Sequence, residues 1–386
     1  MLVLALGHMV NDSYSNVVPP LLPILQAAYG LNYTLSGLIM TVFTITSSVI
    51  QPVFGYFADR HGRRWMVALS VLWTSFFMSM IGIVGCLGLD ATGAYVLILA
   101  LVGMAGFGSS AYHPQASSMV PRISGGRKGL GVSIFSAGGN LGYAIMPVLV
   151  APITMFWGVS GVLILFIPGI IMSFVLNRYA PEAPQATSQL KIVEIWADIR
   201  SVIKPLSIVT IIVCIRAWLF FGLITFLVSY MVHVQHEPQE VSSVFLSVLL
   251  LFGAVGTLIG GHTSDTYGRK FVIVSSLILT GPLLFLALST NGIMELVMLA
   301  LSGVTLLASF SPAVLIAQGL IPKNQGIASG IVLGFAIGVG GLGVSVTGLI
   351  ADTFGLTAGI YSLVLLPIIG LAMAMLLPGK AGPEKR

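Results

Sequence analysis

The feature that most restricts the fold of this chain is a series of apolar runs, each long enough to cross a lipid bilayer. A membrane-spanning helix needs about 20 predominantly apolar residues, and twelve such runs follow one another along the 386 residues. Only 8% of the residues are charged, too few to cover the surface of a soluble protein of this length. The sequence therefore predicts an all-α polytopic membrane protein. The twelve expected spans are 2–27, 33–57, 64–86, 94–120, 129–153, 157–177, 205–234, 239–262, 270–290, 294–320, 326–351 and 356–377.

The twelve runs form two sets of six that repeat one another. Residues 55–64 read G-x-x-x-D-R-x-G-R-R, and residues 261–270 read G-x-x-x-D-T-x-G-R-K. A second pair of matching segments, 139–142 and 340–343, is separated by an offset of 201. We therefore expect pseudo-symmetric halves: an N-terminal six-helix half at 1–177, a cytoplasmic linker at 178–204, and a C-terminal six-helix half at 205–386 that ends in a short cytoplasmic tail.

The distribution of basic residues predicts the orientation in the membrane. If the turn at 57–64 faces the cytoplasm, sixteen of the seventeen lysines and arginines are cytoplasmic, and the external turns carry only acids. Cytoplasmic loops are enriched in lysine and arginine, so both termini are predicted to be cytoplasmic. The net charge of +5 is then a topology signal. Because no basic groove with interleaved aromatic residues is present, we expect no nucleic-acid partner.

The seventeenth basic residue, Arg216, lies well inside the seventh apolar run. A charge at that depth costs about 2.5–3.5 kcal/mol on membrane-insertion scales, so an interaction must offset it. One interpretation is a structural ion pair between helices. The other, which we favour, is a binding site for an anionic group in the central cavity.

Asp12 is the matching acid, in the first run. At helical spacing His8, Asp12 and Asn16 share one face, which Asn11 and Ser15 flank. A polar stripe on an apolar spanning helix has to face the bundle interior or water. Asp12 is therefore predicted to carry protons, with Asn11 and Asn16 as substrate-binding candidates. The alternative is a static hydrogen-bonded network that fixes the first helix.

His113 lies in the middle of the fourth run, followed directly by Pro114. A lone buried histidine is often no more than a neutral hydrogen-bonding group. Here the proline frees a backbone carbonyl, and serines at positions 110 and 117 extend a polar face. A titrating imidazole in such a cavity can carry protons, so we predict that His113 shares proton coupling with Asp12.

Two further helices offer polar side chains that either line the cavity or join helices to one another. The second run has Thr41, Thr44 and Ser48 before Gln51 at helical spacing, and the fifth run has Asn140 and Tyr143. We include Gln51, Asn140 and Tyr143 among the substrate-binding candidates.

The repeated turn at 55–64 and 261–270 resembles the signature of the major facilitator superfamily of secondary transporters, and the resemblance extends over the whole chain. It implies twelve transmembrane helices in two six-helix halves. It also implies that the turn is a gate that holds the cytoplasmic side shut in the outward-open state. Thr266 replaces a usual basic residue, so the second gate should be the weaker one. The gating residues are Gly55, Asp59, Arg60, Gly62, Arg63, Arg64, Asp265, Gly268, Arg269 and Lys270.

Further motifs look like those of the fosmidomycin-resistance branch of bacterial drug exporters. They are His8-x-x-Asn11-Asp12, Tyr112-His113-Pro114, the segments 124–129 and 135–142, and the glycine-rich segment 338–343 with Gly348 and Asp352. The resemblance implies efflux of small phosphonate or other amphiphilic antibiotics, driven by proton entry. A phosphonate would suit Arg216, because a guanidinium pairs with such oxygens bidentately.

We therefore expect a proton-coupled antiporter that works by alternating access as a multi-pass protein of the bacterial plasma (inner) membrane. Its partners would be a small-molecule substrate, protons and the lipid bilayer, and we expect a monomer with no cofactor. An uptake symporter for an anionic metabolite remains open, because no motif sets the direction of coupling. An enzyme or receptor is disfavoured, since the chain shows no metal-ligand spacing, nucleophile elbow or phosphate loop.

Overall fold

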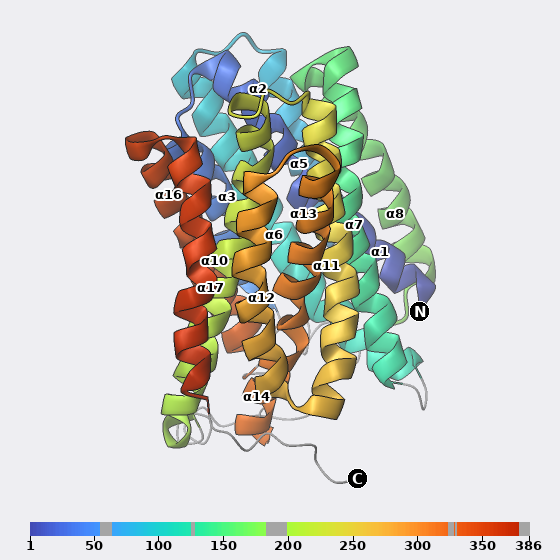
Figure 1. The fold of residues 1–386 in the computed structure, drawn as a ribbon. Coiled ribbons are helices and arrows are strands. Elements are labelled where there is room, and N and C mark those ends of the chain that lie inside the picture. The colour runs from blue at the N-terminus through green and yellow to red at the C-terminus, as the bar shows by residue number, and fades with distance from the viewer. Residues whose placement is uncertain (55–63, 125–127, 183–198, 323–327, 329, 378–386) are drawn as a thin grey trace.

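The computed structural model of the chain describes residues 1–54, 64–124, 128–182, 199–322, 328 and 330–377, and the regular elements in these ranges are all helical (Figure 1). Eleven helices in this part of the chain are long and apolar enough to cross a membrane. The first half comprises α1 (Leu2–Ser13), η1 (Tyr14–Asn16), α2 (Val18–Tyr29), α3 (Tyr33–Ser48), α5 (Arg64–Ser79), η2 (Met80–Gly85), α6 (Ala91–Ile123), α7 (Lys128–Trp157), η3 (Val159–Leu165) and α8 (Phe166–Tyr179).

The second half is built in the same way from long helices that run the height of the bundle. It comprises α10 (Ile203–His233), α11 (Gln239–Tyr267), α12 (Arg269–Ser289), α13 (Gly292–Ala308), α14 (Phe310–Leu320), the π-helical turn η5 (Gly330–Phe335), α16 (Ala336–Phe354) and α17 (Leu356–Met375). The predicted fold class is confirmed. The segments 55–63 and 183–198, which hold the centre of the first repeated turn and most of the predicted linker, lie outside the described residues.

The first span differs from the continuous helix expected at 2–27. It divides into α1 and α2, with the 3₁₀ turn η1 between them. Pro19 and Pro20 open α2, and because proline has no N–H, neither residue can extend the hydrogen-bond ladder of a helix that precedes it. Irregular backbone at membrane depth is tolerated only where protein or a water-filled cavity surrounds it, and the residues of η1 are all buried. The break begins at Tyr14, two residues after Asp12.

The tenth span is broken too. It consists of α13 and α14, with Ser309 between them and Pro312 in the first turn of α14. Pro312 cannot donate to the carbonyl of Ala308, which is the last residue of α13. Discontinuous helices of this kind in membrane proteins often form binding sites for small molecules and ions. Within the described residues, each half therefore contains a span that is interrupted beside prolines.

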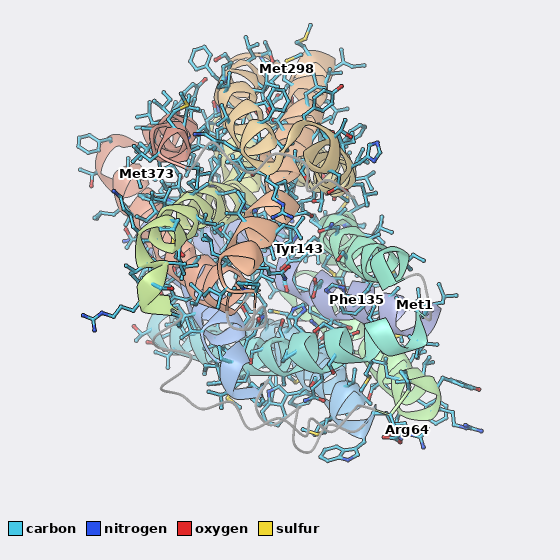
Figure 2. The ribbon with its side chains drawn as sticks, turned by 90° about the horizontal axis from the view of Figure 1, so that it is seen from below. Met1, Arg64, Phe135, Tyr143, Met298 and Met373 are labelled. Carbon is cyan, nitrogen blue, oxygen red and sulfur yellow. The ribbon has the colours of Figure 1, made fainter. Side chains whose placement is uncertain are left out.

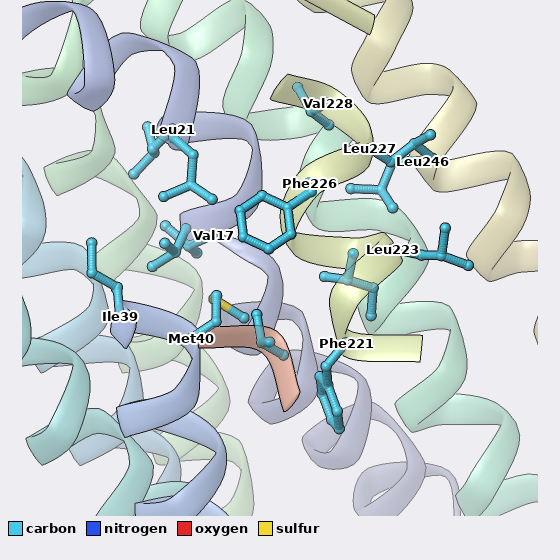
Figure 3. Packing of buried hydrophobic residues seen from close by; sticks show 14 of the residues in the cluster. Val17, Leu21, Ile39, Met40, Phe221, Leu223, Phe226, Leu227, Val228 and Leu246 are labelled. Carbon is cyan, nitrogen blue, oxygen red and sulfur yellow. The ribbon is translucent and has the colours of Figure 1, made fainter. Parts of the chain in front are cut away.

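The hydrophobic core is shared by both halves at one end of the bundle and divided at the other. Figure 3 shows Val17, Leu21 and Met40 of the first half packed in the same cluster as Phe226 and Leu246 of the second. At the opposite end each half has a core of its own. The first-half core contains Leu4, Val67, Val71, Tyr112, Met119 and Phe135, and the second-half core contains Leu206, Ile212, Ile273, Ala317 and Ala374.

A carboxylate joins the two halves at the end where they share a core. Asp352, near the end of α16, accepts hydrogen bonds from the backbone N–H groups of Tyr33 and Thr34, both at 2.8 Å, and from the hydroxyl of Thr34. The first N–H groups of a helix have no partner within the helix, and a negative charge there is favourable. Asp352 therefore caps α3 from the other half of the molecule.

We expect Asp352→Ala to loosen the start of α3. Removal of a helix cap costs about 1 kcal/mol, and bonds to an ionised carboxylate are stronger than neutral ones. Amide hydrogen exchange at residues 33–37, followed by mass spectrometry, should therefore become roughly tenfold faster. Asp90→Ala is the matched control, because Asp90 caps α6 within its own half through the N–H of Gly93. Unchanged exchange at 33–37 in Asp352→Ala would show that the cap does not hold the halves together.

Candidate functional site

Asp12 is the centre of a buried group of polar side chains in the first half. It lies in the last turn of α1 and is 5% exposed. Its Oδ2 is 3.1 Å from Nε2 of His8, one turn earlier on the same helix, and its Oδ1 is 3.4 Å from Nε2 of His113 on α6. Asn11 donates from Nδ2 to the same Oδ1 at 3.0 Å. The two residues predicted to couple protons, Asp12 and His113, are therefore in direct contact.

His8 is held in place from its other side. Its Nδ1 lies 2.7 Å from the backbone carbonyl oxygen of Phe135 on α7. The rings of the two residues also stack, with centroids 4.1 Å apart and planes 18° from parallel. Figure 2 shows Phe135 within the first half, beside the start of the chain. The imidazole thus connects α1 to α7 and presents Nε2 to Asp12.

Glycines on α7 allow this close approach of the two helices. A Cβ atom added at Gly139 would lie 2.6 Å from Nε2 of His8 and 2.7 Å from Oδ2 of Asp12. Side chains at Gly138 and Gly142 would collide with the backbone of α1 at Ala5 and Met9. Any larger residue at 139 would displace the His8–Asp12 contact, so the glycine is part of the site.

His113 is the most accessible member of the group. Its side chain is 27% exposed, against 11% for His8 and 7% for Asp12. Ser109, one turn earlier on α6, places its hydroxyl 3.5 Å from Nε2 of His113 and 3.4 Å from Nδ2 of Asn11. The polar contacts therefore run from a partly exposed imidazole inward to two buried groups.

Three ligand-type atoms of His8, Asp12 and His113 lie within 4.8 Å of one another. Two imidazoles and a carboxylate are a donor set that transition metals accept. The same nitrogen and oxygen atoms can also hydrogen-bond to one another when an imidazole nitrogen or the carboxylate carries a proton. The group can thus be satisfied without an ion.

Two other predicted substrate-binding residues link this group to the second half. Asn16 donates to the carbonyl oxygen of Tyr143 at 2.8 Å. The Tyr143 ring meets that of Phe220 on α10 edge to face, at 6.2 Å between centroids. Tyr143 is labelled in Figure 2 at the place where the two groups of helices meet. Phe220 lies one turn beyond Arg216, on the same face of α10.

In the part of the chain that the structure describes, no hydrogen bond joins Asn140 or Gln51 to Asp12 or Arg216. Asn140 is partly buried and lies one turn before Tyr143 on α7. Gln51 donates to the carbonyl of Ser47 in its own helical turn, at 3.0 Å. In the polar stripe to which Gln51 belongs, Thr41 joins two helices, because its hydroxyl donates to the carbonyl of Gly341 on α16 at 2.8 Å.

Arg216 is buried on α10 with 5% of its surface exposed. Its guanidinium carbon lies 4.9 Å from the ring centroid of Phe310, the first residue of α14. Within the described part of the chain, no carboxylate lies within ion-pair distance of Arg216, and its Nε has no hydrogen-bond partner. The charge is therefore buried against an aromatic ring at the break in the tenth span.

The repeated glycine segments pack close to Asp12 in one half and close to Arg216 in the other. Gly139, which packs on His8 and Asp12, matches Gly340 in the second half. A Cβ atom at Gly340 would lie 2.5 Å from Cβ of Ala217 and 2.6 Å from the carbonyl oxygen of Cys214, so α16 packs on α10 beside Arg216. The same helix seam thus carries an acid in one half and a cation in the other.

The described residues of the repeated turns bind neighbouring helix ends. Arg64 forms an exposed ion pair with Glu182 at 3.0 Å. Gly268 adopts a φ of +92°, which favours glycine. Arg269 donates to the carbonyl of Leu315 at 3.1 Å, and Lys270 donates to the carbonyl of Met375 at 3.0 Å. These contacts of the second copy all lie within its own half.

Asp265 is exposed, and the remaining predicted gating residues lie outside the described residues: Gly55, Asp59, Arg60, Gly62 and Arg63. The gating role of both turns stays a prediction.

Three of the contacts described above could not be predicted from the sequence. The spacing of His8 and Asp12 put them on one face, but the carbonyl of Phe135, which orients His8, has no sequence signature. Gly139 was visible only as part of a repeat. Asp352 was visible only as part of a family motif, with no indication that it caps a helix of the other half.

Comparison with known proteins identifies the family. Residues 4–262 and 231–386 match the Major Facilitator Superfamily. The MFS-type transporter YfnC of Bacillus subtilis strain 168 is 33% identical over 98% of this chain and 92% of its own length. The fosmidomycin resistance protein of Escherichia coli K12 is 30% identical over 95% and 90%, respectively.

The fold is also that of solved transporters. A bacterial homologue of the human lysosomal transporter Spinster, solved in an inward-facing conformation, superposes with a TM-score of 0.81 over 97% of this chain and 95% of its own, at 17% identity. The matches cover both halves, and they confirm the resemblance read from the sequence motifs. The chain is a multi-pass membrane transporter that belongs to the Major Facilitator Superfamily.

Proposed function

We propose that this protein exports small anionic or amphiphilic compounds across the bacterial inner membrane in exchange for protons. The observation that carries the proposal is the contact of Asp12 with two histidines, in a site of which only His113 is appreciably exposed. A buried carboxylate in hydrogen-bond contact with imidazoles can take up and release a proton. Ionisable groups inside membrane helices mark ion pathways and proton relays.

The binding of an anionic substrate group is assigned to Arg216. Its unpaired Nε is a donor that a phosphonate or carboxylate can satisfy, and a guanidinium binds such groups in a fixed bidentate geometry. The aromatic ring of Phe310 beside it suits an amphiphilic molecule. In the first half, Asn11 and Asn16 each have a buried Oδ1 atom without a hydrogen-bond partner. Those oxygens can accept bonds from hydroxyl or N–H groups of the substrate.

The division of the core supports alternating access. The halves share one core at the end where Asp352 caps α3, and they have separate cores at the end that carries the charged turns. If the charged turns are cytoplasmic, as the basic residues predict, this structure is closed to the outside. Along their helices, Asp12 and Arg216 each lie between residues of the shared core and residues of the separate cores. This depth, near the middle of the membrane, is expected for a site that is reached from each side in turn.

The names of two relatives favour export. One relative that covers nearly the whole chain is named a fosmidomycin resistance protein, and another, 23% identical over 71% of the chain, is named a multidrug resistance protein. Resistance to a compound follows when a transporter removes it from the cell. Fosmidomycin is therefore the first compound to test on this protein.

The test is proton movement in inside-out membrane vesicles that hold an acidic interior, followed with a pH-quenched dye. Fosmidomycin and a panel of small anionic and cationic drugs are added one at a time. An exporter releases protons from the vesicle when a substrate is added, and it accumulates that substrate inside. If instead a compound leaves the vesicle together with protons, the protein is an uptake symporter, and the export proposal is wrong.

We expect the protein to act as a monomer, since each chain carries both halves.

A further inference from the structure

We infer that His8 holds the transported proton jointly with Asp12, and that His113 passes it between this pair and solvent. The inference rests on the proposed proton coupling and adds a residue and an order of transfer to it. Its basis is a chain of contacts that runs from the carbonyl of Phe135 through His8 and Asp12 to His113, with distances of 2.7, 3.1 and 3.4 Å.

The tautomer of His8 follows from its partners. A backbone carbonyl oxygen only accepts hydrogen bonds, so Nδ1 of His8 has to carry the hydrogen in its 2.7 Å bond to Phe135. In neutral imidazole the other ring nitrogen is then an unprotonated acceptor. That nitrogen, Nε2, is the atom that faces Asp12.

The contact between His8 and Asp12 consequently needs one proton. An ionised carboxylate is acceptor-only, and unprotonated Nε2 is an acceptor as well, so without a proton two lone pairs face each other at 3.1 Å. One proton on either atom converts this repulsion into a hydrogen bond, as imidazolium with carboxylate or as imidazole with carboxylic acid. The net charge of the pair is zero when the proton is bound and −1 after it leaves to His113.

The chain of contacts has one closed end and one open end. Beyond His8 lies a peptide carbonyl, which cannot pass a proton on, and the backbone of α7 at Gly139 packs directly on the ring and the carboxylate. At the other end, His113 has more than twice the exposed fraction of His8. The proton therefore enters and leaves through His113, and the pair behind it is the store.

Few other titratable groups face the pair. Tyr112 on α6 has its ring 6.1 Å from that of His8 and donates its hydroxyl to the carbonyl of Leu4. Tyr143 faces Asp12 from α7. The helices α5 and α8, which also pack on α1, contribute apolar residues of the first-half core there, among them Val67 and Leu176. The histidines are thus the groups near Asp12 suited to exchange protons near neutral pH.

The deciding experiment is a pH titration of the purified protein, labelled with ¹⁵N-histidine in lipid nanodiscs, by NMR. Signals of His8 are assigned by their loss in His8→Asn. We expect Nδ1 of His8 to stay protonated at every pH, and Nε2 to titrate in a transition that moves by more than one pH unit in Asp12→Asn. If Nδ1 is the unprotonated nitrogen, or if the titration of Nε2 is the same in Asp12→Asn, the pair does not share a proton and the inference is wrong. Because no substrate is added, this result is independent of whether the protein exports drugs.

Transport by His8→Asn separates proton storage from helix anchoring. The asparagine amide can still donate to the carbonyl of Phe135, but it has no counterpart of Nε2. With fosmidomycin as the probe, we expect its proton-driven accumulation to fall at least tenfold. Exchange of fosmidomycin across the membrane needs no net proton movement, so its rate should stay within about threefold of the wild-type rate. That exchange should also lose its dependence on pH. Wild-type accumulation and pH profile in His8→Asn would show that His8 only anchors α1 to α7. His113→Gln should retain the NMR signature of the pair and slow its proton exchange.

Discussion

Asp12→Asn should abolish proton-driven transport while the protein stays folded. Asparagine has nearly the same shape as aspartate and can keep hydrogen bonds to Asn11 and to the histidines, but it can neither release a proton nor hold an imidazolium ion. We expect proton release upon addition of substrate to vesicles to fall at least 100-fold. Substrate binding to the purified protein should change far less, because Arg216 and the amides of Asn11 and Asn16 remain.

The matched control for this substitution is Asp90→Asn, which makes the same chemical change at an exposed helix cap outside the site. Its proton release should equal that of the wild type. Equal thermal unfolding of both variants would show that the loss is not one of folding. Wild-type proton release by Asp12→Asn would overturn the assignment of Asp12 as the coupling residue.

The second large effect is expected at Arg216. Arg216→Gln should weaken the binding of anionic compounds by a factor of about 30 or more, since truncation of one member of a buried charge pair costs about 2–5 kcal/mol. Arg216→Lys should bind with intermediate affinity, because lysine keeps the charge but cannot form the bidentate contact. Binding of cationic compounds from the same panel should not decrease. Equilibrium binding of labelled fosmidomycin to the wild type and to both variants measures the effect on an anionic compound.

Arg216→Gln should also make the substrate-free protein more stable. A buried charge without a partner carboxylate is costly, and the contact with Phe310 returns only about 0.5–2 kcal/mol. We expect a rise in Tm of about 2 °C or more. A structural ion pair would behave in the opposite way, because its removal would lower both Tm and expression. A decrease in Tm with unchanged affinity for anions would therefore exclude the binding role.

The sequence predicted the fold well because the physics of the bilayer leaves few alternatives. Lipid offers no partner for peptide groups, so each long apolar run has to form a helix. The repeated turns then indicate two halves. The ends of the expected spans agree with the observed helices to within a few residues. The break after Asp12 was harder to predict, since Pro19 and Pro20 are also compatible with a kinked but continuous helix.

The candidate site was predicted in part. Charged and polar residues in apolar runs are conspicuous, and Asp12, His113 and Arg216 were found for that reason. Which of them meet could not be predicted, because sequence spacing reports the face of one helix and not the distance to another helix. The structure places His113 against Asp12 and leaves Arg216 without a carboxylate. It thereby excludes, within the described residues, the ion pair that the sequence left open.

The sequence by itself determined the class of this protein, its two-fold repeat and the identity of the residues that carry charge into the membrane, because each of these depends on local composition and spacing. Only the tertiary structure decided how those residues are partnered. The tautomer of His8 depends on a carbonyl of α7 that lies 127 residues away in the chain. The cap on α3 depends on Asp352, 318 residues beyond Thr34. Such contacts arise from the packing of one helix against another, which no single segment of sequence encodes.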